Sequence, residues 1–277
     1  MKKTKLSEKL IYLAIYLSAA LSLTAMLAII GYIVFKGAPI VDWTFLTSPY
    51  KGAEHGIYPM IVTTLYMIVV SLAVSAPIGI CSAIYLNEYA KAGKLVRIIR
   101  FATDSLSGIP SIIYGLFGYM FFVTALQLKM SILSGSLTLA IMVLPLVIRT
   151  TEEALKTVPM AYREGSLALG ASKISTIFRI VLPSAAQGII TAIILSTGRI
   201  VGETAAVYLT AGMVTRVPGG IMESGRTLAV HLYVLAKEGI SFEQAYASAT
   251  VLLVIIAVLN ILAVRLASGI RKRMLGN

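Results

Sequence analysis

Two long uncharged apolar runs, at residues 10–35 and 105–128, constrain this chain more than any other feature. Each exceeds the roughly 20 apolar residues that carry a helix across a bilayer, and a soluble core needs no such run. The whole chain has 58% apolar and 13% charged residues, with a mean hydropathy of +0.88. The sequence therefore predicts an all-α membrane protein with several spans.

Six apolar segments predict six transmembrane helices. We expect them at residues 10–35, 59–86, 105–128, 132–148, 185–213 and 244–267. The first segment is too long for the core of a cleavable signal peptide, so we expect it to remain as an anchor. The expected parts are an N-terminal helix with its external loop (1–58), a transmembrane domain (59–267) and a basic tail (268–277).

The excess of basic residues, a net charge of +12, gathers on one side of the expected spans. The four basic clusters lie near residues 2–9, 91–100, 149–179 and 265–273, whereas the opposite loops hold basic and acidic residues in near balance. By the positive-inside rule, both termini lie in the cytoplasm of a multi-pass protein of the cell membrane. The same asymmetry explains the net charge, so we expect a lipid bilayer, and no nucleic acid, as the partner of these residues.

The chain shows no pattern typical of an enzyme. Gly93-Lys94 lacks the upstream glycine and the following hydroxyl of a phosphate-binding loop, and no paired metal-ligand spacing appears. We expect His55 and His231, which stand alone in external segments, to be ordinary interfacial side chains. Cys81 is the single cysteine. We therefore predict that this chain catalyses no reaction itself and binds no metal or cofactor.

Arg199 and Glu203 stand four residues apart inside the span expected at 185–213, so both would lie on one face of one helix. Arg199 would then lie about 20 Å from the start of the helix, near the centre of a hydrocarbon core about 30 Å thick. A charge at that depth costs at least about 2.5 kcal/mol, so its position needs a reason. A planar guanidinium that donates paired hydrogen bonds to an anion crossing the membrane supplies one.

Two roles are open for Glu203 beside Arg199. Its carboxylate would hold the guanidinium while the path is empty and would accept a hydrogen bond from hydrogen phosphate, which sulfate cannot donate. Alternatively, the two charges form a buried ion pair that only fixes helix packing. The spacing of Gly198 and Gly202 supports this alternative, because small residues four apart permit close helix approach.

Further candidates for the substrate path are a helix break and several hydroxyls. Pro110 and Ser111 interrupt the third expected span, and the break either faces a polar cavity or is only a packing kink. The hydroxyls either line the same path or bond to their own helix backbone. These hydroxyl residues are Ser196, Thr197 and Thr204.

Residues 150–183 form the largest charged segment and lie on the predicted cytoplasmic side. We expect a short helix from Met160 or Ala161, ended by Gly170 with a positive φ angle. Ser172 would begin a second helix that leads into the next span. Such an elbow is either a rigid knob on which a soluble partner docks or a solvated connector.

The spacing within this segment resembles the EAA loop of ABC importer permeases. The matching positions are Glu164, Gly170, Ile180, Leu182 and Pro183. Gly165 and Ser166 stand where the family has two alanines, so both residues remain small. The resemblance implies the type I importer fold, in which this loop forms a coupling helix that inserts into a separate ATPase. ATP would be used by that partner and not by this chain.

A finer resemblance covers most of the chain. Residues 107–116 and 198–205 are similar to the phosphate-transport permeases, and residues 228–239 resemble their PstA branch in particular. The resemblance implies inorganic phosphate as substrate, a heterodimer with the sister permease PstC, two copies of the ATPase PstB, and the phosphate-binding protein PstS. Two other function classes stay open. One is a gradient-driven secondary transporter of an oxyanion with Glu203 as proton carrier; the other is a scaffold or receptor that transports nothing.

Overall fold

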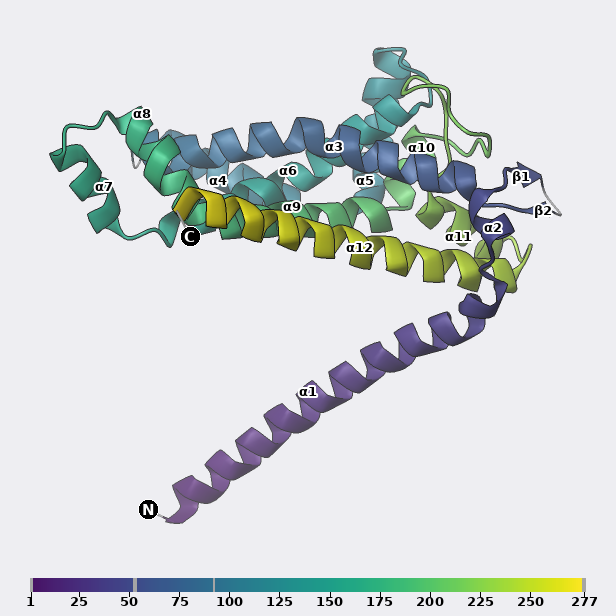
Figure 1. The fold of residues 1–277 in the computed structure, drawn as a ribbon, viewed down its shortest axis with the longest axis horizontal. Helices are drawn as coiled ribbons and strands as arrows, with labels where there is room; N and C mark the ends of the chain where they lie inside the picture. The colour runs from purple at the N-terminus through teal and green to yellow at the C-terminus, as the bar shows by residue number, and fades with distance from the viewer. Residues whose placement is uncertain (1, 52–53, 92, 276–277) are drawn as a thin grey trace.

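The computed structural model describes residues 2–51, 54–91 and 93–275, which form a helical bundle with one long helix standing away from it (Figure 1). Among these residues, five helices are long and apolar enough to cross a membrane, and a bent pair supplies a sixth crossing if it counts as one span. The five are α1 (Lys2–Gly37), α3 (Tyr58–Ile84), α6 (Ile132–Lys156), α9 (Leu182–Gly202) and α12 (Phe242–Leu275). The prediction of an all-α membrane protein is confirmed.

Helices α3, α6 and α9 pack against one another and form the centre of the bundle. Most of their buried apolar side chains belong to two clusters. The smaller cluster includes Ala83, Leu155 and Val181, and the larger one includes Met67 and Val143 in the other half of the bundle. Lipid tails are as apolar as these side chains, so close packing rather than water exclusion holds the helices together.

Short elements mark the two ends of the bundle. At one end, α7 (Met160–Ala168) and α8 (Lys173–Thr176) form an elbow, which η4 (Ile177–Val181) joins to α9. At the other end lie η1 (Ala38–Ile40), α2 (Trp43–Thr47) and a small antiparallel hairpin of β1 (Tyr50–Lys51) and β2 (Glu54–His55). Helix α1 begins, and α12 ends, on the elbow side (Figure 1). Six crossings, with the bent pair counted as one, would produce this arrangement.

Helix α1 touches the bundle only near its own C-terminal end. There the Tyr32 and Tyr246 rings meet edge to face with centroids 5.7 Å apart, and the Thr250 hydroxyl donates to the Ile33 carbonyl over 3.2 Å. The side chains of residues 8–32 are exposed. An apolar helix without protein around it suits a lipid-embedded anchor. Of the expected basic tail, residues 268–275 continue α12, and residues 276–277 lie outside the described part.

The third expected span differs from the prediction. Residues 105–107 belong to α4 (Lys94–Ser107), and the chain then bends by 102° into α5 (Ser111–Gly118), which continues as η3 (Tyr119–Ala125). The bend lies at residues 108–110, because proline lacks an N–H and restricts the residue before it. The predicted interruption at Pro110 is therefore confirmed, but the residues before it belong to a helix that begins at Lys94 and not at residue 105.

The fifth expected span also differs, because α9 ends at Gly202 and does not continue to residue 213. Glu203 has an extended backbone, with φ −75° and ψ 128°, and a separate helix, α10, follows at Ala205–Thr210. The Glu203 carboxylate accepts a hydrogen bond from the Ala206 N–H over 3.2 Å, which satisfies one free donor at the start of α10. The expectation that Arg199 and Glu203 share one helix face is therefore wrong.

The apolar part of the external segment between the last two spans forms a short helix, α11 (Leu228–Lys237). Thr227 caps its start, and the Leu228 N–H donates to the Thr64 hydroxyl of α3 over 3.0 Å. His231 is fully buried, so its prediction as an interfacial side chain is wrong. The helix is built into the bundle and does not lie loosely on its surface. The side chain of His55 is outside the described part.

Candidate translocation path and coupling site

The two short helices that follow the breaks, α5 and α10, pack against each other. Gly115 of α5 packs on α10, and a Cβ atom added there would lie 2.8 Å from the Ala206 Cα. On the same turn of α5, the Tyr114 hydroxyl donates to the Leu106 carbonyl over 2.8 Å and so spans the bend between α4 and α5. The break at residues 108–110 is itself largely exposed in this chain, and interrupted backbone in a membrane requires surrounding protein or a polar cavity.

Arg199 lies in the last turn of α9, next to these breaks, and is half-buried. Its positive charge lies close enough to the Tyr114 hydroxyl to act on it electrostatically. The ion pairs among the described residues do not join Arg199 to Glu203. A cation is favoured at a helix C-terminus by the helix dipole. The end of α9 is therefore a favourable position for the guanidinium. Its N–H donors are not bound to the Glu203 carboxylate.

The glycines beside Arg199 do not pack against another helix of this chain. A Cβ atom added at Gly198 or Gly202 would meet nothing within 4 Å. The close-packing role that their spacing suggested is therefore absent among the described residues. One side of the end of α9 is open to whatever lies next to this chain.

The other predicted path residues divide by exposure. Ser196 is fully buried and its hydroxyl has no hydrogen-bond partner among the described residues, while the Thr197 hydroxyl donates to the Ile193 carbonyl of its own helix. Pro110 is exposed, and Ser111 and Thr204 are half-buried. Of the two roles open for the Thr197 hydroxyl, the structure shows the hydrogen bond to its own helix backbone.

The elbow has the local structure expected from its sequence. Gly170 has a φ of +84°, and the N–H groups of Gly170 and Ala171 donate to the carbonyls of Leu167 and Ser166 at the end of α7. These paired bonds close a helix with a left-handed residue, which glycine adopts without strain. Ser172 caps α8 by accepting from the Ser175 N–H over 3.2 Å. The predicted helix, turn and cap are confirmed.

The predicted coupling residues lie on two sides of the elbow. Glu164 and Gly165 are exposed, whereas the Ser166 hydroxyl is buried and lies 2.9 Å from the Thr176 hydroxyl of α8. The half-buried positions, where the chain enters the bundle, are Ile180, Leu182 and Pro183. The tip residue Leu169 is 90% exposed. The elbow therefore has a rigid, packed inner side and a free outer side.

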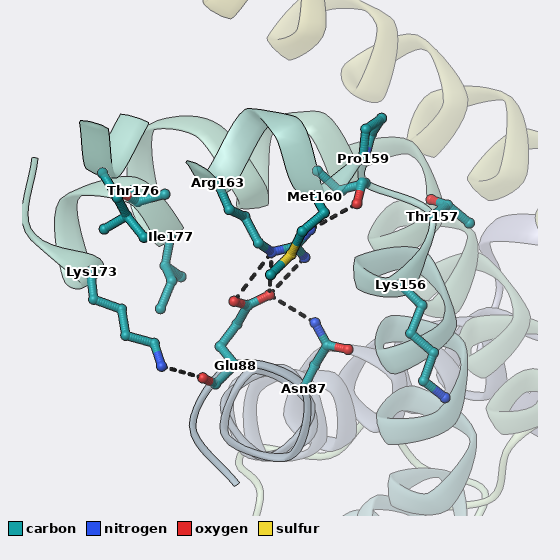
Figure 2. Close-up of a pocket in the computed structure, with 12 residues that line it drawn as sticks. Asn87, Glu88, Lys156, Thr157, Pro159, Met160, Arg163, Lys173, Thr176 and Ile177 are labelled. Atoms are coloured by element: carbon teal, nitrogen blue, oxygen red, sulfur yellow. Dashed lines mark hydrogen bonds and ion pairs between the residues drawn. The ribbon is translucent and has the colours of Figure 1, made fainter. Parts of the chain in front are cut away.

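Behind the elbow is a cavity of about 620 Å³, lined by the ends of α3 and α6 and by α7 and α8 (Figure 2). Glu88 and Arg163 meet there, with 2.8 Å between Oε1 and Nη2, and their side chains are only 8% and 12% exposed. Glu88 belongs to η2 (Tyr85–Tyr89), the π-helical end of α3. Neither residue was singled out from the sequence. The available signal was an acidic residue at the end of an apolar span, among basic neighbours.

These features define a class: a polytopic membrane protein in which a helix ends beside a half-buried arginine and a helical elbow has an exposed outer side. Residues 75–276 match the family model described as the binding-protein-dependent transport system inner membrane component. The chain belongs to this family of ABC importer permeases.

Relatives and solved structures agree with this assignment. The probable ABC transporter permease protein YqgI of Bacillus subtilis is 31% identical over 99% of both chains. The phosphate transport system permease protein PstA of Mycobacterium leprae is 32% identical over 92% of this chain and 88% of its own.

Among solved structures, a chain of the bacterial alginate ABC transporter covers 94% of this chain and 95% of its own, with a TM-score of 0.64 and 16% identity. A chain of the methionine transporter MetNI covers 78% of this chain and 94% of its own, with a TM-score of 0.60 and 18% identity. At such low identity these structures establish the fold alone. The predicted type I importer fold is confirmed.

Proposed function

We propose that this chain is the PstA-type subunit of an ATP-driven importer and that, with a sister permease, it passes inorganic phosphate across the membrane. The observation that carries the choice of site is the position of Arg199, half-buried in the last turn of α9, just before the chain leaves the helix at Glu203. Relatives named as phosphate permeases, such as the one from Mycobacterium leprae, support the choice of substrate.

Arg199 would replace part of the hydration shell of phosphate as the anion passes. Its fork donates two parallel hydrogen bonds to phosphate oxygens and keeps its charge at any physiological pH. Glu203 lies one turn beyond it in sequence but outside the helix, where its carboxylate accepts from the Ala206 N–H. That carboxylate would accept a hydrogen bond from the acidic hydroxyl of hydrogen phosphate. The remaining candidates for this path are Ser196, Ser111, Thr204 and the break at Pro110.

The open side of α9 at Gly198 and Gly202 suits a path shared with a second subunit. The expected partner is the sister permease PstC, which would close the path from the opposite side. Helix α1, whose residues 8–32 are exposed, offers a further surface to lipid or to that subunit. Phosphate would arrive from the binding protein PstS at the hairpin end of the bundle.

The elbow would face the cytoplasm, as the basic clusters near both termini indicate. Its exposed outer side, with Glu164, Gly165 and Leu169, would enter a groove on the ATPase PstB, one copy for each permease. Its inner side, with Ser166 and Pro183, would pass the movement to the spans. This chain then needs no nucleotide site of its own.

A reconstituted complex tests the proposal. The chain is purified with its sister permease and ATPase, placed in vesicles, and assayed for ATP hydrolysis stimulated by phosphate-loaded binding protein. Arg199→Gln should abolish the stimulation, whereas Arg216→Gln, which removes the same charge from a side chain that is 72% exposed at the surface, should not. Equal stimulation in wild type and Arg199→Gln would remove Arg199 from the path. Failure to recover an ATPase would contradict the importer.

A further inference from the structure

We propose that Glu88 and Arg163 fasten the elbow to α3, so that a movement of the elbow reaches α3 as well as α6 and α9. The inference rests on the proposed function, in which the elbow docks on an ATPase. The chain itself joins the elbow only to α6 and, through η4, to α9. Helix α3 ends beside the elbow without a direct chain connection to it, so side-chain contacts must make the third link.

Arg163 makes that link through one guanidinium. Its Nε and Nη2 atoms donate to the Glu88 carboxylate over 3.2 Å and 2.8 Å (Figure 2). Its Nη1 atom donates to the Val158 carbonyl over 2.7 Å, and Nη2 also donates to the Leu155 carbonyl over 3.0 Å. Those carbonyls lie at and just beyond the C-terminal end of α6. One side chain of α7 is therefore bound both to the end of α3 and to the end of α6.

A second contact comes from the other arm of the elbow. Lys173 of α8 donates to the backbone carbonyl of Glu88, and its ammonium lies 4.5 Å from the centre of the Tyr89 ring. Asn87 donates to the Glu88 carboxylate over 2.7 Å and holds it from the α3 side. Both arms of the elbow thus grip the same π-helical segment, Tyr85–Tyr89. We call these contacts the clasp: Asn87, Glu88, Tyr89, Arg163 and Lys173.

Burial makes the clasp stiffer than a surface ion pair. The Glu88 and Arg163 side chains are 8% and 12% exposed, so separating them leaves two charges with little access to water. The exposed pair of Lys156 and Glu153, with side chains 44% and 73% exposed, has no such penalty. The two residues of the clasp are positioning residues, because they act on the path only through the helices that they join.

The inner side of the elbow supports the same conclusion. The Ser166 and Thr176 hydroxyls, 2.9 Å apart, tie α7 to α8, so the two arms move as one body. Force on the exposed tip at Leu169 would be transmitted through this body to the clasp. Without the clasp, the elbow would still pull on α6 and α9 but would slide past α3.

The test uses the complete importer in vesicles and measures phosphate transported per ATP hydrolysed. Glu88→Ala should lower this ratio by about tenfold while ATP hydrolysis continues, because the ATPase still binds the elbow. Glu153→Ala, which removes an acid from the exposed pair, should leave the ratio unchanged. An unchanged ratio in Glu88→Ala, with uptake by the wild type, overturns the clasp and leaves the proposed function standing. A wild type that shows no ATP-driven uptake overturns both.

A second measurement does not depend on how well the variant assembles. Spin labels at Tyr85 and Leu169, placed in a Cys81→Ser background, report the distance between the end of α3 and the tip of the elbow. In the otherwise unchanged protein this distance should stay the same with and without bound ATP, because the two parts move together. Glu88→Ala should broaden the distribution of distances between the two labels. A distance in the unchanged protein that shifts between the two states overturns the proposal.

Discussion

Gly115 of α5 lies directly against the backbone of Ala206 of α10, so closely that a Cβ atom at position 115 would be 2.8 Å from the Ala206 Cα. Each of these short helices follows a break in its span. The contact therefore sets how the two breaks face each other, and with them the surroundings of Arg199. Any side chain at position 115 would push the two segments apart.

Gly115→Val should destabilise the protein by about 1–3 kcal/mol, because the added atoms meet backbone that cannot move aside easily. Thermal unfolding of the purified complex measures the effect as a lower melting temperature. Gly31→Val is the matched control, since a Cβ atom there meets nothing within 4 Å. Equal melting temperatures for the wild type and Gly115→Val would show that the two helices are not in contact.

Arg199→Lys should weaken phosphate transport without abolishing it. The charge remains, but the paired hydrogen bonds of the planar fork are lost, so the KM for phosphate delivery should rise by about tenfold. Uptake at a series of concentrations of phosphate-loaded binding protein measures this. Arg216→Lys, at the exposed surface, should leave the KM as it is. A KM that does not change in Arg199→Lys would argue for a role of charge alone.

Two glycine substitutions in the elbow should have opposite effects on stability. Gly170→Ala forces an alanine into a φ of +84°, which costs about 1–2 kcal/mol. Gly165→Ala lies within α7, where a Cβ atom meets nothing within 4 Å, so better helix propensity should stabilise the elbow by up to about 1 kcal/mol. The rate at which a protease cleaves the elbow in the purified complex ranks the two variants and the wild type by the stability of the elbow. Two variants that shift resistance in the same direction would contradict the turn geometry.

Low pH should destabilise the hairpin end through His231. Burial and the nearby charge of Arg226 lower the pKa of His231 from 6.5 to about 4, and its ring packs edge to face on Tyr50. Above pH 6.5 the folded and unfolded forms are both neutral, so this residue adds no pH dependence there. Between pH 6.5 and about pH 4, His231 binds a proton in the unfolded form and not in the folded form. The free energy of unfolding therefore falls by on the order of 3 kcal/mol across this range.

Melting temperatures of the purified complex at a series of pH values measure this loss. As the pH falls from about 7 to about 4.5, the melting temperature of the wild type should fall further than that of His231→Gln, because glutamine does not titrate. The two proteins should converge in slope above pH 6.5. Parallel curves across the whole range would mean that His231 is protonated without cost in the folded state.

The elbow could be predicted in detail because its structure is encoded locally. Gly170 ends α7 with a left-handed residue and Ser172 caps α8, and both roles depend on backbone groups within a few residues. The break at Pro110 was also predictable, because proline lacks an N–H. The 102° bend that follows was not, since it depends on how α5 packs against α10.

The break after Gly202 was missed because the apolar pattern continues across it. Residues 185–213 look like one span, and the carboxylate of Glu203 was assigned to Arg199 by helical spacing. In the structure that carboxylate accepts from the Ala206 N–H, an interaction that also lies within the local sequence. A polar residue just before a new helix was the signal that could have revealed it.

The clasp could not be predicted, because its partners are far apart in sequence. Glu88 and Arg163 are separated by 75 residues, and Arg100 and Glu152, which pair between α4 and α6 at 2.7 Å, by 52. The sequence alone shows that charged residues lie near the ends of the spans. The positive-inside rule already accounts for basic residues there, so nothing in the sequence points to a specific pair. Only the packing of α3 beside the elbow identifies which charges meet.

Uptake of labelled phosphate into vesicles is the measurement that tests most directly whether this chain forms an ATP-driven phosphate path around Arg199. Vesicles holding the wild-type complex, supplied with binding protein and with ATP on the elbow side, should accumulate phosphate. Those holding Arg199→Gln should assemble equally well and accumulate almost none. Accumulation by this chain without its ATPase under a proton gradient, or uptake by Arg199→Gln at the wild-type rate, would contradict this function.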